Sequence, residues 1–164
     1  MKTWVWAVGL ALVGAVLVLP QEAHAQWRMQ AASFCLPVTP TYQDVRSNTG
    51  AIGNGGAGAM RLACPILDDA YMDKGTLSGA YVDLYDGTNV GSVDVRPCVT
   101  YGFNMGGSCG PANVSTPSNI GMTTLGIDMS VWVTHQWEYG YILVNLPPAQ
   151  GGRASAVHGY YLYR

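Results

Sequence analysis

The chain has 164 residues, of which 49% are hydrophobic and 11% are charged, and its formal net charge is -2. This apolar content excludes a disordered chain, and the absence of heptads and of a Gly-X-Y period excludes a coiled coil and a collagen. Lys and Arg form no cluster, so the charge pattern of a protein that binds nucleic acid or an anionic membrane is missing.

The first 25 residues have the pattern of a secretory signal peptide. Lys2 supplies a positive charge, an apolar run covers 4–19, and Ala23 and Ala25 are small residues at the cleavage positions. The run is shorter than the roughly 20 residues that a transmembrane helix needs. We therefore predict that 1–25 is removed on export. The remainder, 26–164, is predicted to be one secreted domain, extracellular or periplasmic, without a membrane span.

The four cysteines all lie in the predicted mature chain, and an even count in an exported protein indicates disulfides. Three pairings are possible, and spacing alone does not decide among them. We favour Cys35 with Cys64 and Cys98 with Cys109, because the second pair closes a short Gly-rich loop. The alternative is a metal site, but there is no C-x-x-C and no histidine at ligand spacing, so we expect neither a metal nor a cofactor.

Alternation of apolar and polar residues recurs along 26–164, whereas the helical period does not. It predicts strands at 60–64, 80–85, 93–99, 121–128, 131–134, 141–146 and 155–163. The turn residues 86–89 predict that the second and third of these strands form a β-hairpin. The Gly-rich stretch 101–118 is predicted to be a long loop.

Several short antiparallel strands at this spacing predict an all-β fold, an antiparallel β-sandwich with two disulfides, for which a jelly-roll arrangement is one option. One conflict remains in the third strand. Cys98 falls on the polar side of that strand with Asp94 and Arg96. This requires either a bulge at Pro97 or a disulfide on the outer face of the sheet.

The segments 77–86, 139–147 and 157–163 carry the strand pattern in its clearest form. In their order and spacing the chain resembles uncharacterised exported bacterial β-sandwich proteins, over roughly the region from Cys35 to the C-terminus. The resemblance implies a fold and an export route. It implies no catalytic residues.

Two segments match the sequence patterns of known catalytic or binding motifs. Gly53–Gly58 matches the dinucleotide-binding G-x-G-x-x-G, but a strand rather than a helix follows it, so we interpret it as a loop between strands. Ser108 lies in a G-x-S-x-G motif, with Asp128 and then His135 or His158 after it, as in a hydrolase triad. A nucleophile elbow needs a parallel sheet with helices, which this sequence does not predict.

Carboxylates could also supply oxygen ligands for Ca²⁺, although without EF-hand spacing. The two candidate sets are Asp68, Asp69 and Asp73, and Asp83, Asp86 and Asp94. Surface Asp residues in turns and on outer strand faces are ordinary, which is the alternative interpretation.

Aromatic residues are the most distinctive feature of the sequence. Tyr160, Tyr161 and Tyr163 crowd the last predicted strand. A second group clusters within ten residues, and we predict that its members form a ligand-binding face: Trp132, Trp137, Tyr139 and Tyr141. If Ile142 and Val144 point inward, the rings at 137, 139 and 141 point outward, where they could stack on sugars. Packing between strands and a subunit interface are the alternatives.

These observations predict a secreted, non-enzymatic β-sandwich that acts by binding or assembly, as a surface, matrix or accessory protein. A polysaccharide or a cell-surface component is the expected partner, self-association is possible on the same face, and nucleic acid is not expected. The alternative is a small secreted hydrolase that uses Ser108 with Asp128 and a histidine.

Overall fold

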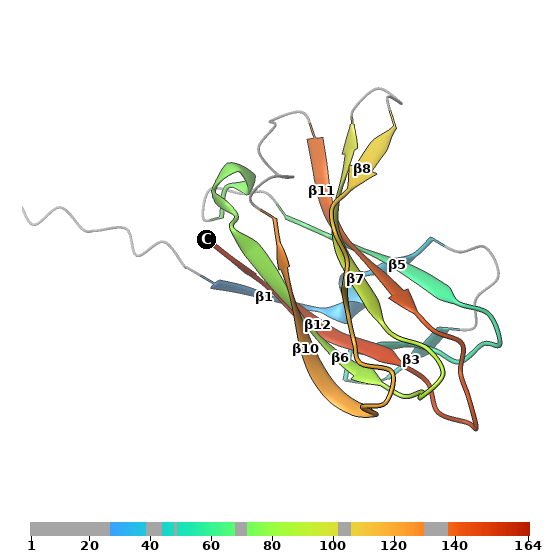
Figure 1. Cartoon of the computed structure of the whole chain (residues 1–164). Helices are drawn as coiled ribbons and strands as arrows, with labels where there is room; N and C mark the ends of the chain where they lie inside the picture. The colour runs from blue at the N-terminus through green and yellow to red at the C-terminus, as the bar shows by residue number, and fades with distance from the viewer. Residues whose placement is uncertain (1–26, 39–43, 48, 68–71, 102–105, 130–137) are drawn as a thin grey trace, which may run out of the picture.

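The computed structural model describes residues 27–38, 44–47, 49–67, 72–101, 106–129 and 138–164 (Figure 1). These residues form a sandwich of two antiparallel sheets, named here after their central strands. The β12 sheet contains β1 (Trp27–Ala31), β3 (Asp44–Arg46), β4 (Ile52–Asn54), β6 (Gly79–Asp86), β10 (Gly121–Asp128) and β12 (Ala156–Tyr163). The β11 sheet contains β2 (Leu36–Pro37), β5 (Met60–Pro65), β7 (Asp94–Tyr101), β8 (Gly107–Cys109), β9 (Asn113–Val114) and β11 (Glu138–Leu146). Two short 3-10 helices, η1 (Ala32–Phe34) and η2 (Lys74–Thr76), connect strands.

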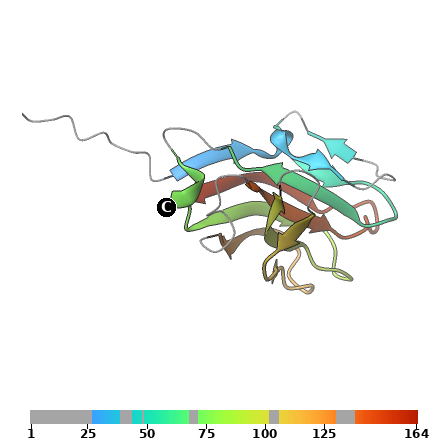
Figure 2. The same cartoon turned by 90° about the horizontal axis from the view of Figure 1, so that it is seen from above.

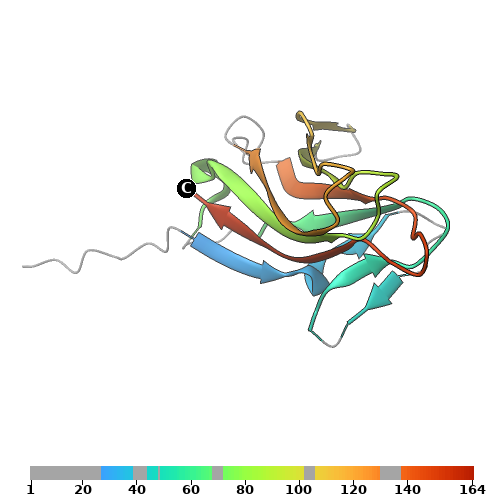
Figure 3. The same cartoon turned by 60° about the horizontal axis from the view of Figure 1, so that its bottom comes forward.

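In the β12 sheet, β12 lies between β6 on one side and two shorter strands, β1 and β4, on the other (Figure 3). β10 pairs with the far side of β6, and β3 pairs with β4. The C-terminus therefore lies beside the start of β1, where Tyr163 pairs with Trp27. This arrangement puts strands from both ends of the chain into one surface.

In the β11 sheet, β11 lies between β5 and β7, and β2 pairs with the outer side of β5. β8 and β9 pair with opposite ends of β7 along its outer edge. The predicted long loop at 101–118 therefore contains two short strands. Seen from above, the two sheets overlap along their long strands (Figure 2).

The core fills the space between the two sheets. Every second residue of the long strands points into it, as the alternation predicts. The inward residues are Ala80, Val82 and Leu84 on β6, Leu125 and Ile127 on β10, Leu162 on β12, Leu62 on β5, Val95 on β7, and Ile142, Val144 and Leu146 on β11. The all-β sandwich that the sequence predicts is thus confirmed. In the part of the chain described, no helix has the length and apolar character needed to cross a membrane.

The predicted hairpin at 80–99 is wrong. β6 pairs with β10 and β12, whereas β7 pairs with β11, β8 and β9, so the two strands lie in different sheets. The connection 87–93 crosses from one sheet to the other, which lie roughly 10 Å apart in such sandwiches. Alternation predicts which residues point to the core. It does not distinguish two strands paired in one sheet from two strands in facing sheets, because both arrangements bury these residues.

Both predicted disulfides are present, Cys35 with Cys64 and Cys98 with Cys109. The register of β7 against β11 is continuous from Asp94 to Tyr101, so Pro97 marks no bulge and the Cys98 disulfide lies on the outer face. The carbonyl of Pro97 accepts a hydrogen bond from the N–H of Gly110, which lies between β8 and β9. The nitrogen of Pro97, which carries no hydrogen, is on the same side of the strand and faces this gap. A missing donor is tolerated at such an interrupted edge.

Among the described residues, Tyr160 is the largest fully buried side chain, and its hydroxyl donates a hydrogen bond to the carbonyl of Pro65 at 2.7 Å. Burial raises the pKa of Tyr160, whereas in the unfolded chain it returns to about 10. The protonated phenol thus stabilises the fold fully below pH 10, and this stabilisation falls as the pH rises toward the folded-state pKa. The fall is at most about 1.4 kcal/mol per pH unit.

We expect Tyr160→Phe to remove that dependence above pH 10, while it lowers stability at pH 7 by about 1 kcal/mol through the lost hydrogen bond. Urea unfolding of both proteins between pH 7 and pH 11 measures this. Tyr139→Phe, which alters an exposed ring, is the matched control. Parallel pH profiles for wild type and Tyr160→Phe would contradict the assignment.

Candidate functional site

The outer face of the β12 sheet gathers aromatic side chains from three strands. The register places Trp27 of β1 beside Tyr163 of β12, and Tyr161 of β12 beside Tyr81 of β6. We call these four residues the aromatic face. Trp27 is 55% exposed and Tyr81 is 38% exposed, and Tyr161 and Tyr163 are half-buried. Large rings therefore lie at the surface of the sheet rather than in its core.

Three of these rings form one contact cluster. The ring centroids of Trp27 and Tyr81 lie 6.2 Å apart with an interplanar angle of 15°. Tyr163 lies 5.3 Å from Trp27 and 5.2 Å from Tyr81. Trp27 and Tyr163 are each stacked with Tyr81, whereas Trp27 and Tyr163 are tilted by 36° to each other; stacked pairs at such separations have the offset arrangement that aromatic pairs prefer.

Two glycines allow the tyrosine rings to lie against the sheet. Gly79 is the cross-strand partner of Tyr163, and a Cβ on Gly79 would collide with the Tyr163 hydroxyl. Gly126 is the partner of Tyr81, and a Cβ there would lie 2.9 Å from Cε1 of the Tyr81 ring. Any larger residue at these positions would displace a ring, so the absent side chains set the ring positions.

A carboxylate lies next to the rings. Asp83, two residues after Tyr81 on β6, accepts a hydrogen bond from the Tyr161 hydroxyl at 2.5 Å and one from Oγ1 of Thr124 at 2.6 Å. Each of its two oxygens receives one of these bonds. Since a carboxylate offers about four acceptor positions, roughly two remain for other donors.

Two shallow hollows adjoin the rings and the carboxylate. One, of about 500 Å³, is lined by Trp27, Met29, Tyr81, Asp83, Thr124 and Tyr161. The other, of about 330 Å³, is lined by Met29, Gln30, Ala31, Asp83, His158, Gly159, Tyr160 and Tyr161. Met29, Asp83 and Tyr161 line both, so the two hollows are neighbours on this face, and together we call them the groove.

A β-bulge forms one end of this groove. The register between β12 and β6 shifts between Val157 and Gly159, which leaves His158 as the extra residue. Its side chain is exposed. Bulges bend a strand and redirect a side chain, and they are frequent beside functional sites.

The surroundings of the tyrosines favour their protonated forms. The hydrogen bond to Asp83, and then the charge of that carboxylate, raise the pKa of Tyr161. Burial and then the neighbouring Tyr81 raise the pKa of Tyr163. At neutral pH the Tyr161 hydroxyl is therefore a donor that holds the Asp83 carboxylate in position.

The sequence-predicted site residues lie elsewhere. Tyr139 and Tyr141 are on β11, on the outer face of the opposite sheet; Tyr139 is 72% exposed and Tyr141 is half-buried. Trp132, Trp137 and the predicted strand at 131–134 are outside the described residues. The sequence analysis missed the contribution of Trp27 and Tyr81, although it noted Tyr161 and Tyr163. The available signal was the alternation of large apolar residues at Trp27 and Met29, which marks β1.

The components of the hydrolase alternative that the structure describes are divided between the two sheets. Ser108 lies on β8 at the edge of the β11 sheet, whereas Asp128 and His158 lie on β10 and β12 of the other sheet. His158 is exposed on the outer face of that sheet, away from the sheet that carries Ser108. His135 is outside the described residues.

The glycine motif at 53–58 has a structural role. Its first residues belong to β4, and no helix follows. Asn54 is buried, donates hydrogen bonds to the carbonyls of Gly58 at 2.7 Å and Pro147 at 2.8 Å, and accepts one from the Gly56 N–H at 3.0 Å. These bonds fasten the loop after β4 to the end of β11.

The acidic residues considered for Ca²⁺ are dispersed. Asp83 lies on the outer face of the β12 sheet, Asp86 is fully buried, and Asp94 pairs with Arg96 on the outer face of the β11 sheet. Asp73 caps the turn at η2 through the Gly75 N–H, and 68–69 is outside the described residues. Within the described ranges, no three His, Cys, Asp or Glu side chains are grouped to hold a metal ion.

The sequence matches no protein-family model and no curated protein. Among solved structures, the chain is similar to a low-affinity xylan-binding module from Roseburia intestinalis, with a TM-score of 0.51, 8% identity, and coverage of 83% of this chain and 93% of the module. A family 11 carbohydrate-binding module from Clostridium thermocellum gives a TM-score of 0.46, 11% identity, and coverage of 87% and 91%. A family two carbohydrate esterase from Cellvibrio japonicus gives 0.46, 9%, and coverage of 84% and 33%. The first of these similarities shows the fold, a β-sandwich of the type found in carbohydrate-binding modules.

Proposed function

We propose that the protein binds a polysaccharide through the aromatic face, as an exported, non-enzymatic binding protein. The observation that carries the proposal is the surface cluster of Trp27, Tyr81 and Tyr163, of which Trp27 and Tyr81 are exposed, beside a groove. Sugar rings have apolar faces that stack on flat aromatic rings, and hydroxyls that bond to nearby polar groups. Binding sites combine these two features in the same way, with apolar walls and a few placed polar atoms.

Exposure distinguishes this cluster from rings that only stabilise the sheet. Trp27 is 55% exposed and the adjacent Met29 is 72% exposed. Rings whose role is packing between strands are normally covered by their neighbours, whereas a surface patch of large apolar residues marks an interaction site.

Export is the second part of the proposal. Two disulfides are typical of proteins that fold in an oxidising compartment, and both pairs are formed. The apolar run at 4–19 supports removal of a signal peptide, which leaves 26–164 as the secreted domain.

The test is a binding assay with purified, oxidised 26–164 and a panel of polysaccharides: xylan, mixed-linkage β-glucan, galactomannan, amorphous cellulose and chitin. Xylan is included because the Roseburia module is described as binding it. Retardation in affinity gels and sedimentation with the insoluble polymers measure binding. We expect Trp27→Ala to weaken the interaction by about 30-fold, the effect of removing one central aromatic anchor.

Tyr139→Ala is the matched control, because it removes an exposed ring from the opposite sheet. Thermal melts of both variants verify that they fold. Binding that is lost in Tyr139→Ala and kept in Trp27→Ala would move the site to the outer face of β11, which carries Tyr139 and Tyr141 of the ligand-binding group predicted from the sequence. Wild-type protein that binds no member of the panel would contradict the proposed function.

A further inference from the structure

We infer that Asp83 determines the ligand class of the groove: it selects neutral glycan chains with free adjacent hydroxyls and rejects acidic polysaccharides. This inference rests on the proposed function, since it concerns the same site. The inference goes beyond the proposed function because it names the residue that discriminates between polysaccharides and the sugar groups that this residue recognises.

The first argument is the position of Asp83. It lines both hollows, and it lies beside Tyr81 and Tyr161. A sugar stacked on the ring cluster would therefore present its edge, where the hydroxyls are, toward this carboxylate. Trp27 and Ala31 mark the two ends of the groove along β1, about 13 Å apart at roughly 3.3 Å per residue. The groove is thus long enough for part of a chain.

The second argument is the hydrogen-bonding state of the carboxylate. Oδ1 accepts from Thr124 and Oδ2 accepts from Tyr161, which fixes the plane of the carboxylate. Each oxygen retains about one acceptor position. Two adjacent sugar hydroxyls can donate one bond to each oxygen, and bonds to a charged acceptor are roughly twice as strong as neutral ones.

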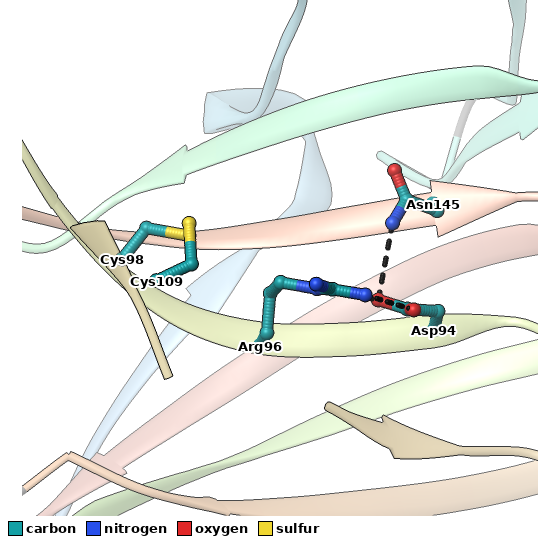
Figure 4. Close-up of polar contacts among 5 residues, drawn as sticks. All are labelled: Asp94, Arg96, Cys98, Cys109 and Asn145. Atoms are coloured by element: carbon teal, nitrogen blue, oxygen red, sulfur yellow. Dashed lines mark hydrogen bonds and ion pairs between the residues drawn. A yellow bond between two sulfur atoms is a disulfide. The ribbon is translucent and has the colours of Figure 1, made fainter. Parts of the chain in front are cut away.

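A second carboxylate shows the contrasting case. Asp94, on the outer face of the other sheet, forms an ion pair with Arg96 and accepts a hydrogen bond from Asn145 at 3.0 Å (Figure 4). The guanidinium occupies both oxygens of Asp94 and neutralises its charge. Asp83 instead receives bonds from two neutral hydroxyls, so its negative charge is available to a ligand.

The third argument is the charge of the groove. Neither Lys nor Arg is among the residues that line the two hollows; His158 is the basic side chain there, and it lies at one end. A uronic acid would bring a second carboxylate next to Asp83, where neither Lys nor Arg lines the hollows to pair with it. Like charges placed together disfavour such a complex, so the site excludes acidic chains.

The experiment compares wild type with Asp83→Asn, a variant of the same shape in which one acceptor oxygen becomes a donor. The probes are the neutral polymer that wild type binds best in the panel above, and polygalacturonate and alginate as acidic polymers. We expect wild type to bind only the neutral polymer. Asp83→Asn should bind the neutral polymer at least 10-fold more weakly and lose the discrimination against the acidic ones.

Asp94→Asn is the control, because it removes a carboxylate charge from the opposite face and should leave both affinities unchanged. Equal neutral binding by wild type and Asp83→Asn, together with loss in Trp27→Ala, would overturn this inference and leave the proposed function intact. Preference of the wild type for polygalacturonate or alginate would also overturn it. A wild type that binds no polysaccharide would overturn both.

Discussion

An Asp86→Ala substitution is expected to lower the free energy of unfolding by about 3 kcal/mol or more, although Asp86 is distant from the aromatic face. The carboxylate is fully buried at the end of β6. It accepts hydrogen bonds from the Ser115 hydroxyl, from the Ser155 hydroxyl at 3.2 Å and from the Thr88 N–H at 3.3 Å. Alanine would remove the acceptor and leave the hydroxyl protons of Ser115 and Ser155 without an acceptor.

The size of the effect follows from what these hydroxyls do in turn. Ser155 accepts a hydrogen bond from the Gly87 N–H at 2.9 Å, and Ser115 accepts one from the Val93 N–H at 2.8 Å. Both N–H groups belong to the connection 87–93 between the two sheets. Asp86 thereby fixes the orientation of each hydroxyl and, through them, both ends of the crossover. Loss of one member disturbs the whole network.

Urea unfolding followed by circular dichroism measures the change, and the melting temperature should fall by about 10 °C. Asp94→Ala is the control, since it removes a partly exposed ion pair with Arg96 and should change stability by at most about 1 kcal/mol. A decrease of less than 1 kcal/mol in the free energy of unfolding of Asp86→Ala would show that this hydrogen-bond network does not stabilise the connection between the sheets.

Asp86 also bears on why the connection after β6 was predicted wrongly from the sequence. The turn residues 86–89 are the same ones that a hairpin uses, and both arrangements bury the same side of β6 and β7. The informative signal was the parity of Asp86, which shares the inward side with Val82 and Leu84. A hairpin leaves such an Asp in solvent, whereas a crossover can bury it against Ser115 and Ser155.

Local pattern did predict the strands that alternate most clearly. The predicted segments at 60–64, 121–128 and 155–163 coincide closely with β5, β10 and β12, and the outward direction of Tyr139 and Tyr141 is as expected. Both disulfides are also as predicted. These features depend on residue type and parity over short distances, which one sequence records.

The candidate site depends instead on pairing between the two ends of the chain. Trp27 meets Tyr163 only because β1 adds to the edge of β12, and Tyr81 reaches both through β6 on the other side. Nothing in the residues near Trp27 specifies that partner. The tyrosines of the last strand were visible in the sequence. The exposed ring that completes the cluster is Trp27, which is 136 residues before its cross-strand partner Tyr163. Register over such separations is a property of the folded sheet.

The second large effect is expected from the Cys35–Cys64 disulfide. Both of its cysteines are buried, and it closes a loop with a sequence separation of 29. Loop-closure entropy assigns such a bond about 3.5 kcal/mol, and replacement of both cysteines by alanine also removes buried contacts from the core. The Cys98–Cys109 bond, with a separation of 11, corresponds to about 3 kcal/mol on the same basis. The variant in which Cys35 and Cys64 are both alanine should therefore unfold at a lower urea concentration than the variant in which Cys98 and Cys109 are both alanine.

Accessibility should separate the two bonds further. Cys109 is exposed at the edge strand β8, whereas neither sulfur of the other pair is near solvent. A thiolate must reach a disulfide sulfur to reduce it. Under native conditions, dithiothreitol should open Cys98–Cys109 first, and Cys35–Cys64 should open only with denaturant. Timed alkylation followed by peptide mass spectrometry reports each bond separately. Simultaneous reduction of both bonds would contradict this order, because it would require that the segment carrying Cys35 opens as readily as the exposed edge at β8.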